Sequence, residues 1–216
     1  GVRKIYYQAN LEYFTDASGK KVESREQQGT FRVDFTSGDR TQVEASRTYE
    51  AIETPFTPAK GVRVPVGGYA FQQILASYTF GTQRKVSGTA SVTRGGFYDG
   101  TITEVSWRSR VEFSPQSYAE PTVTLNRIHV PWGRGNSNLI SSRLTYTLSP
   151  RMFVSGLVQY QARTDSVATN ARFRWEYQPG SELFIVYSDG RTTLSPGIPD
   201  LQSSSFIVKV TKLLQF

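Results

Sequence analysis

The stretch VATNARFRWEY, residues 167–177, alternates between apolar and polar side chains along most of its length. In an extended strand, successive side chains point to opposite faces. One face would carry Val167, Thr169, Ala171, Phe173, Trp175 and Tyr177, and the other would carry Ala168, Asn170, Arg172, Arg174 and Glu176. Such sustained alternation predicts a long β-strand with two chemically different faces.

The same pattern recurs along most of the chain, with little helical periodicity. EVSWRSRVEF, residues 104–113, and QGTFRVDF, residues 28–35, alternate in the same way. About twelve such segments are present, and they begin near Arg3, Val22, Arg40, Tyr69, Arg84, Thr101, Tyr118, Asn138, Met152, Val167, Glu182 and Ser203. Many reach about ten residues or more, whereas an ordinary strand has about five or six. A tilted strand needs about 9–11 residues to cross a bilayer, so this length is typical of a membrane β-barrel.

The turns between these segments fall into two sets that alternate along the chain. One set is short: SGD at 37–39, GT at 81–82, SPQS at 114–117, SP at 149–150 and PGS at 179–181. The other set is longer on average: TDASGKK at 15–21, TPAKGVRVPVGG at 57–68, PWGRGN at 131–136 and TLSPGIPDLQ at 193–202, although DG at 99–100 and the join at 165–166 are tight. Outer-membrane barrels have short periplasmic turns and longer extracellular loops, and this pattern matches them.

Aromatic residues end most of the strands that lead into the short turns. They are Phe35, Phe80, Phe113, Tyr146, Trp175 with Tyr177 and, at the end of the chain, Phe216. Aromatic rings favour the headgroup boundary, because the ring is apolar while a polar tip stays hydrated. The pattern predicts a periplasmic aromatic girdle. The final strand, residues 203–216, would then act as the recognition signal for barrel insertion, through Phe206, Val208, Val210, Leu214 and Phe216.

The composition is compatible with this architecture. The chain is 38% hydrophobic with a mean hydropathy of −0.40, and it has no run of about 18 apolar residues such as a transmembrane helix needs. A membrane barrel hides its apolar face in alternation. A soluble antiparallel sandwich or lipocalin-like barrel also alternates and remains the alternative. Strand length, the arginine-rich opposite faces and the girdle favour an all-β, antiparallel transmembrane β-barrel with about twelve visible strands, in a single domain over residues 1–216.

Motifs for catalysis or metal binding are scarce. The chain has no cysteine and one histidine, His129, which we interpret as a residue at the barrel rim. We therefore expect no catalytic residue, no metal and no cofactor. The net charge is +7, but no run of Lys and Arg exceeds two residues, which counts against nucleic-acid binding.

The predicted inward face carries a series of charged side chains on successive strands. Those on the lumen side are Glu104, Arg108, Arg110, Glu112, Arg143, Arg172, Arg174, Glu176 and Lys209. They can pair across strands and stabilise the wall, at about 0.2–1 kcal/mol for each exposed pair. The planar donors of arginine also suit sugars and anions. Arg47 and Lys212 fall on the apolar side instead; Lys212 is near enough to the end to reach the interface, and we interpret Arg47 as marking a bulge that changes its face.

Several stretches resemble the C-terminal barrel of an uncharacterised bacterial outer-membrane family: PRMFVSGLVQY (150–160), ARFRWEYQPGSELFIVYSDGRTT (171–193), SSSFIVKVTKLLQF (203–216), SREQQGTFRVDFTSGDR (24–40), RTYE (47–50) and VPVGGYAFQ (64–72). The resemblance spans essentially the whole chain. It implies an outer-membrane location and an upstream module similar to family-nine carbohydrate-binding modules, so that this chain would be the C-terminal part of a longer protein. It supplies no reaction and no catalytic residues. Twelve strands are enough to close a barrel, and they are equally compatible with being the last twelve of a wider one.

We therefore expect a protein of the Gram-negative outer membrane, in contact with the lipid bilayer and lipopolysaccharide and inserted by the barrel assembly machinery. A channel or uptake barrel for a glycan or small polar solute is the first-ranked function. A membrane anchor that displays the upstream module is the second. An outer-membrane hydrolase using Glu104, Glu112 and Glu176 is the third, because neighbouring arginines should keep these carboxylates ionised.

Overall fold

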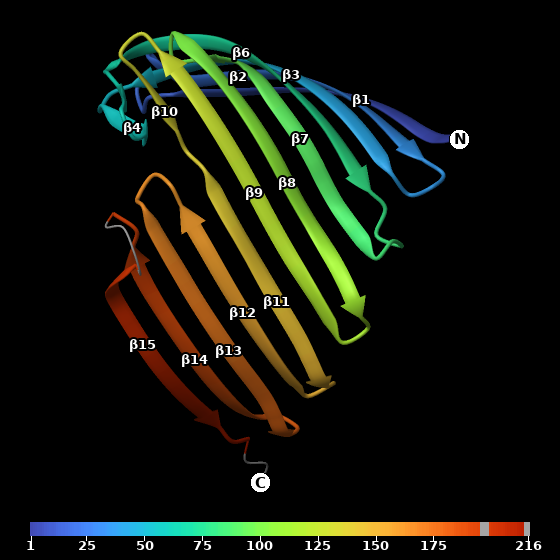
Figure 1. Ribbon diagram of the computed structural model, residues 1–216. Coiled ribbons are helices and arrows are strands. Elements are labelled where there is room, and N and C mark those ends of the chain that lie inside the picture. Colours follow the sequence, from blue (N-terminus) through green and yellow to red (C-terminus); the bar gives the residue numbers. More distant parts are fainter. Residues whose placement is uncertain (195–198, 214–216) are drawn as a thin grey trace. The chain divides into compact units, whose positions relative to one another are not determined.

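The computed structural model describes residues 1–194 and 199–213, and β-strands dominate it (Figure 1). The strands are β1 (Val2–Thr15), β2 (Val22–Phe35), β3 (Arg40–Ile52), β4 (Phe56–Ala59), β5 (Val62–Val64), β6 (Gly67–Phe80), β7 (Val86–Phe97), β8 (Gly100–Ser114), β9 (Ser117–Val130), β10 (Gly133–Asn136), β11 (Leu139–Ser149), β12 (Met152–Gln161), β13 (Ser166–Gln178), β14 (Ser181–Thr192) and β15 (Asp200–Thr211). Each long strand begins within three residues of its predicted start. The described residues contain no helix that could span a membrane.

Thirteen strands form one sheet, in the order β1-β2-β3-β6-β7-β8-β9-β11-β12-β13-β14-β15 with β10 paired to β9. Consecutive long strands are neighbours, as expected for strands joined by hairpin turns. The predicted all-β, antiparallel fold class is confirmed. The chain divides into two compact units, residues 1–108 with 124–138 and residues 109–123 with 139–216, and each is described by itself.

In the first unit, the pairing register separates the side chains into an apolar face and a polar face. One row of the apolar face crosses five strands through Tyr7, Phe31, Val43, Ala76 and Val92. The adjacent row of the polar face contains Gln8, Thr30, Glu44, Leu75 and Thr93. A slip of one residue in any pair would exchange the two faces of that strand, so the register is specified by this contrast.

The second unit has the same two faces. Its apolar face includes a row through Tyr146, Val154, Phe173, Ile185 and Val208. The adjacent row of the polar face contains Thr145, Ser155, Arg172, Val186 and Ile207. Strand β14 departs from the alternation, because residues 183–187 (LFIVY) are apolar on both faces. Figure 1 shows β14 between β13 and β15, which pair with its two edges.

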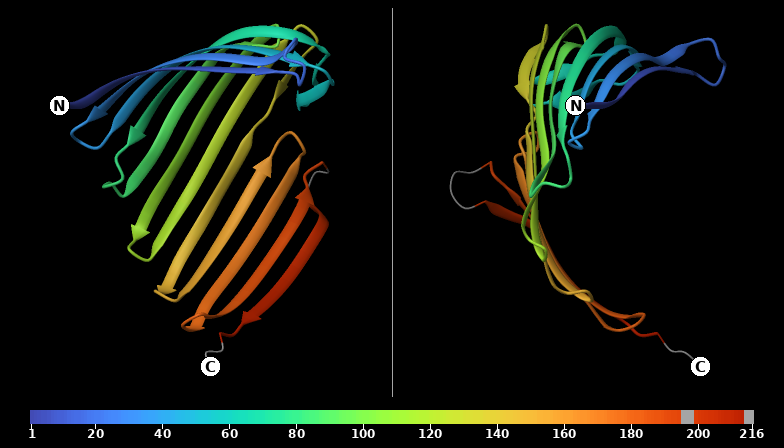
Figure 2. Two further views of the ribbon diagram at one scale, coloured as in Figure 1. Left: turned by 180° about the vertical axis from the view of Figure 1, so that it is seen from behind. Right: turned by 90° about the vertical axis from the view of Figure 1, so that its right-hand side faces the viewer.

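The long loops contain structure that the sequence did not predict. Residues 57–68 were expected to form an irregular loop, but β4 and β5 form a hairpin there, and residues 133–136 of the next loop form β10. Figure 2 shows the hairpin, in teal, beside the ends of its neighbouring strands. Gly133 permits a close approach, since a Cβ atom at this position would lie 2.0 Å from the Gly61 carbonyl oxygen. These strands are short and contain several small residues, so their sequences show no clear alternation between apolar and polar side chains.

The hairpin contributes to the only two clusters of buried apolar residues among those described. One contains Ala59, Val62, Ile128 and Val130, and the other contains Val64, Tyr69 and Tyr98. Phe97 and Trp132 pack against both clusters. Tyr69 lies in β6 on the same side as Leu75, so the hairpin packs on the polar face of the first unit.

The last strand is shorter than predicted. It was expected to run over residues 203–216, but β15 ends at Thr211, and Lys212 and Leu213 follow it outside the strand. Phe206, Val208 and Val210 of the predicted insertion signal lie on the apolar face opposite Tyr187, Ile185 and Leu183. Leu214 and Phe216 lie outside the described residues.

Candidate functional site

Aromatic rings on the polar face of the second unit support the predicted lumen arginines. The guanidinium of Arg172 lies 5.8 Å from the centre of the Phe153 ring and 5.2 Å from that of Phe184. Arg174 lies 5.7 Å from the Phe184 ring and forms a salt bridge with Glu182. Cation–π contacts hold such side chains in place while part of each guanidinium stays available to water or solute. The sequence analysis identified the arginines but not the rings that position them.

Arg110 is held in a similar way. Its guanidinium stacks 3.5 Å from the centre of the Tyr118 ring. Its Nε donates to Glu112 Oε1 at 3.0 Å, and its Nη1 lies 3.9 Å from Glu120 Oε1. Three groups from the β8–β9 hairpin therefore surround one cation: Glu112 lies along the same strand, whereas Tyr118 and Glu120, which the sequence analysis did not single out, lie on the neighbouring strand.

The remaining predicted lumen charges are less constrained. Arg108, Arg143 and Lys209 are exposed and form no salt bridge within the described part of the chain. Glu176 accepts a hydrogen bond from the Gly180 backbone at 3.3 Å, at the short turn after β13. Arg143 and Lys209 belong to the second unit, whose polar face thus combines fixed arginines with free cations, an arrangement suited to contact with an anion or a sugar hydroxyl.

The polar face of the first unit has a different character. A shallow hollow in it is lined by Glu44, Ser46, Gln73, Leu75, Thr93, Ile102 and Glu104. Glu44 and Glu104 form no salt bridge in the described residues, so the hollow is acidic. Glu104 was predicted to lie beside arginines, but no arginine is among the residues that line this hollow with it.

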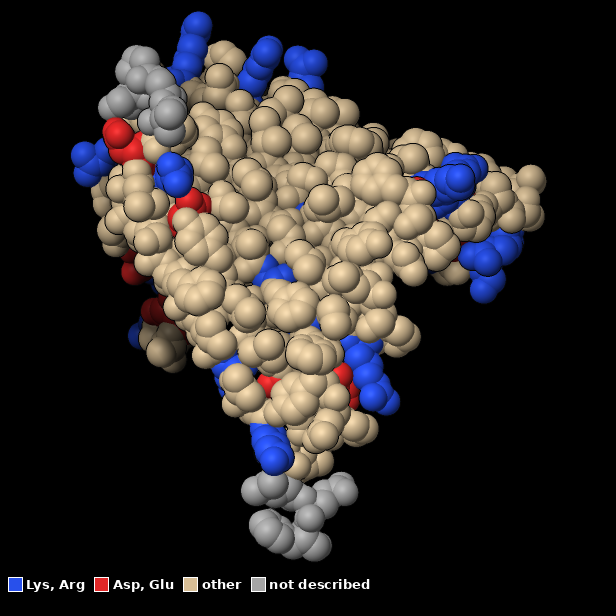
Figure 3. All heavy atoms as spheres, turned by 60° about the horizontal axis from the view of Figure 1, so that its bottom comes forward, with Lys and Arg blue, Asp and Glu red and all other residues tan. Residues whose placement is uncertain are grey.

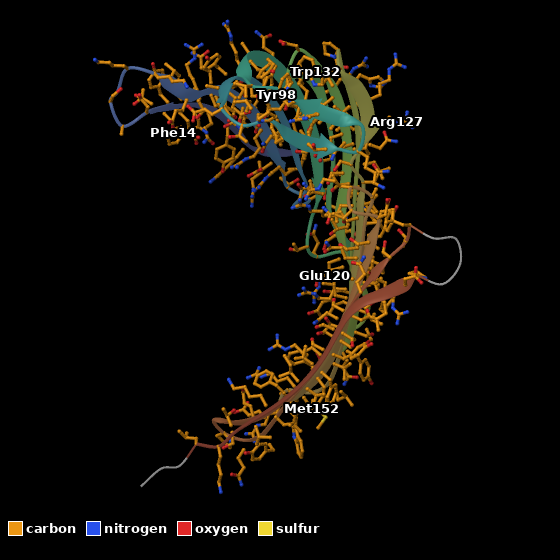
Figure 4. The ribbon with its side chains drawn as sticks, turned by 90° about the vertical axis from the view of Figure 1, so that its left-hand side faces the viewer. Phe14, Tyr98, Glu120, Arg127, Trp132 and Met152 are labelled. Carbon is orange, nitrogen blue, oxygen red and sulfur yellow. The ribbon has the colours of Figure 1, made fainter. Side chains whose placement is uncertain are left out.

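The two buried clusters under the β4–β5 hairpin, together called the hairpin cluster, lie on the polar face of the first unit near the long loops. The rings of Phe97 and Tyr98 meet edge to face at 4.6 Å, and those of Tyr69 and Tyr98 at 5.3 Å. The Tyr98 hydroxyl donates to the Glu50 carboxylate, and burial raises the pKa of Tyr98 above its ordinary value. Figure 4 shows Tyr98 and Trp132 together on this side of the unit.

The described members of the predicted girdle lie at strand ends, beside the short turns. Phe35 ends β2 and Phe80 ends β6 in the first unit; Phe113, Tyr146, Trp175 and Tyr177 lie near the ends of β8, β11 and β13 in the second. The Tyr78 and Phe80 rings are 4.9 Å apart, and those of Trp175 and Tyr177 are 6.0 Å apart. The Tyr177 hydroxyl also donates to the Thr211 carbonyl at 3.0 Å, which ties β13 to the end of β15.

The interpretation of Arg47 as marking a bulge is wrong. The pairing of β3 with β2 and with β6 is regular through this position, with Gln27 opposite it on one side and Gln72 on the other. Arg47 therefore does lie on the apolar face, with Val43 and Ala45.

On the face shown in Figure 3, charged side chains do not form one continuous surface. In the view of Figure 3, Lys and Arg side chains stand apart from one another, separated by neutral residues. The described residues contain no group of three His, Cys, Asp or Glu side chains placed to bind a metal ion. His129 is exposed in β9, where its backbone pairs with Arg134.

No family model matches the chain, and no curated protein matches it. Two solved porin structures show similarity to it. "KdgM porin in complex with disordered oligogalacturonate" is 9% identical, with a TM-score of 0.35, over 95% of this chain and 94% of that one. "NanC porin structure in rhombohedral crystal form" is 10% identical, with a TM-score of 0.39, over 99% of this chain and 98% of that one. At these values, no residue role and no activity is transferred from either porin.

Proposed function

We propose that the chain forms a β-barrel in the outer membrane of a Gram-negative bacterium and that its polar face lines a channel for small polar solutes. The observation that carries this proposal is the continuity of the apolar face across strands of 10 to 15 residues. Each of the two rows described above keeps its apolar character across five paired strands.

The exposure of this face favours a membrane over a soluble fold. On strands that have a neighbour on each side, Ile74 is 58% exposed and Val158 is 52% exposed. Within each unit, no other described element covers the apolar face, and the packed clusters lie on the polar side. A soluble sandwich would place these residues in its core, where each large apolar side chain contributes about 1.5–3 kcal/mol. An apolar surface of this extent instead fits lipid.

The polar face supports solute passage. Its arginines on ring platforms can exchange hydrogen bonds with sugars or anions without losing their position. A glycan or small polar solute is therefore the proposed cargo, and the upstream carbohydrate-binding-like module implied by the resemblance would capture it. Insertion would use the barrel assembly machinery, with Phe206, Val208 and Val210 in the terminal signal.

The three tryptophans provide a direct test. Trp107 and Trp175 are exposed on the apolar face, whereas Trp132 packs in the hairpin cluster. Three single-tryptophan proteins, with Phe at the other two positions, would be refolded into vesicles with and without brominated acyl chains. We expect bromine to quench Trp107 and Trp175 strongly and Trp132 weakly. Quenching of Trp132 alone would mean that the face assigned to the lumen contacts lipid instead. No quenching at any of the three positions would favour the soluble β-fold.

A membrane anchor with an occluded interior is the second candidate, and one observation favours it. The β4–β5 hairpin packs on the polar face, where it would narrow the long-loop end of a barrel. Planar-bilayer recording separates the two functions, because a channel conducts and an occluded anchor does not. Deletion of residues 56–64 should raise conductance if the hairpin is the obstruction.

A further inference from the structure

Four arginines lie on the apolar face of the first unit, toward the strand ends that join the long loops. They are Arg25 in β2, Arg47 in β3, Arg94 in β7 and Arg127 in β9. All four are exposed, and none forms a salt bridge within the described residues. A lipid-facing surface normally lacks charge, so four unpaired cations of one kind require a reason.

The register places these side chains near one another. Arg25 is opposite Tyr49, the next residue on the same face of β3 after Arg47, so the two arginines are diagonal neighbours. Arg94 is opposite Ile74, which follows Gln72 on its face of β6. Neighbouring strands lie about 4.8 Å apart and each residue advances about 3.4 Å along a strand, so the backbones at Arg47 and Arg94 are about 12 Å apart before their side chains extend.

Arg127 belongs to the same face. Its neighbour Ile128 is buried under the hairpin on the polar side, so Arg127 points the other way. Figure 4 shows Arg127 projecting away from Tyr98 and Trp132.

The surroundings of the arginines are suited to an anion. Gln27 and Gln72 flank Arg47 directly, and their amides can donate hydrogen bonds. The nearest carboxylate on the same face of β2 is that of Glu23, two residues beyond Arg25 toward the loop. The cations therefore lack a protein counter-charge in the rows they occupy. A guanidinium binds phosphate oxygens in pairs, with better geometry than a lysine would offer.

An apolar groove lies next to the arginines, on their short-turn side. The residues of the apolar face that line it are Tyr7, Ala9, Gly29, Phe31, Val43 and Ala45. Ala9, Gly29 and Ala45 form one row across three strands, and they are smaller than the residues of the adjoining row of Tyr7, Phe31 and Val43. A Cβ atom at Gly29 would meet nothing within 4 Å, so this row is open to an external group.

We propose that this surface binds lipopolysaccharide of the outer leaflet, with lipid phosphates on Arg25, Arg47, Arg94 and Arg127 and an acyl chain in the groove. Charge and shape agree: the cations lie on the long-loop side, where headgroups would be, and the groove lies toward the membrane interior. This inference rests on the proposed insertion of the chain in an outer membrane.

The first experiment compares two variants with the same loss of charge. One carries R25Q, R47Q and R94Q on the apolar face, and the control carries R143Q, R172Q and R174Q on the polar face. Each protein is purified from outer membranes, and the lipid phosphate that it retains is measured. We expect at least about a tenfold loss for the first variant, equivalent to about 1.4 kcal/mol of binding, and no loss for the control. Equal retention by both would overturn the proposal.

A second experiment identifies the ligand and does not depend on the triple variant folding. The unmodified protein and an A45F variant, whose added ring fills the groove, are refolded in detergent and heated with lipopolysaccharide, dephosphorylated lipopolysaccharide or inorganic phosphate. We expect only intact lipopolysaccharide to raise the melting temperature, and A45F to respond less. Stabilisation by inorganic phosphate alone would indicate a simple anion site and overturn the lipid assignment. If brominated lipid quenches Trp107 and Trp175 but lipopolysaccharide does not change the melting temperature, the lipopolysaccharide site is wrong and membrane insertion stands. If neither tryptophan is quenched, both proposals are wrong.

Discussion

Arg84, in the turn after β6, donates a hydrogen bond from its Nη2 to Asp39 Oδ2, in the turn before β3, at 2.7 Å. The Gly81 backbone donates to Asp39 Oδ1 at 2.8 Å, and the Tyr78 hydroxyl and the Ser37 hydroxyl donate to Oδ2 at 2.9 and 3.0 Å. One carboxylate therefore connects two successive short turns at the same rim. The Gly81 hydrogen bond, followed by those of Arg84, Tyr78 and Ser37, lowers the pKa of Asp39 from 3.8 to about 2.

This carboxylate should make the stability of the rim depend on pH. A group whose pKa is lowered by folding stabilises the folded state above its unfolded pKa of about 4, and that contribution is lost as the pH falls toward about 2. We expect Asp39→Asn to lower the melting temperature at neutral pH and to reduce its change between about pH 4 and about pH 2. The measurement is the temperature at which the unboiled band disappears from SDS gels. Asp200→Asn, at an exposed position, is the control, and an unchanged pH profile in Asp39→Asn would contradict the assignment.

The hairpin offers a matched pair of valines. Val64 is fully buried between Tyr69 and Tyr98, whereas Val66, two residues later, is 58% exposed. Removing two methyl groups and leaving a cavity should cost about 1–3 kcal/mol at Val64 and little at Val66. We expect Val64→Ala to accelerate tryptic cleavage within residues 56–64 and Val66→Ala to leave the rate unchanged. Similar rates in both variants would show that the cluster does not hold the hairpin.

The polar face should set ion selectivity if the chain conducts. Arg172 and Arg174 are positioned by the rings of Phe153 and Phe184. We expect the double change to Gln to shift the reversal potential in a salt gradient toward cation selectivity, because two fixed positive charges leave the wall. Lys20→Gln, in an exposed loop, should have no effect. If the double variant has the same ion selectivity as the unmodified protein, these arginines stabilise the barrel wall and do not contribute to selectivity.

Deletion of Phe216 tests the predicted insertion signal. We expect the shortened protein to accumulate in the periplasm and to lose the heat-dependent shift in outer-membrane fractions. Phe216→Tyr should retain both, because it keeps the ring that the predicted girdle requires. Normal insertion of the deletion variant would remove the terminal aromatic from the signal.

The alternation was sufficient to locate the long strands and their faces, because a period of two is readable wherever the faces differ in polarity. Arg47 shows the limit of that reasoning: alternation placed it correctly on the apolar face, and a bulge was invoked only because a charge there was unexpected. The Asp39 connections join residues up to 45 apart, and turn sequences carry no signal for such contacts. Phe184, the ring beneath Arg172 and Arg174, was hidden in a run that is apolar on both faces.

That run in β14 also matters before the protein is folded. Residues 183–187 form a short segment of consecutive apolar residues with high β-propensity, and no charge, proline or glycine interrupts it. Such segments self-associate readily when their edges are unpaired. In the native sheet, β13 and β15 occupy those edges. If the chain is exported as proposed, β14 is therefore a segment prone to aggregation before folding, and shielding by a holding chaperone would matter more there than at the alternating strands.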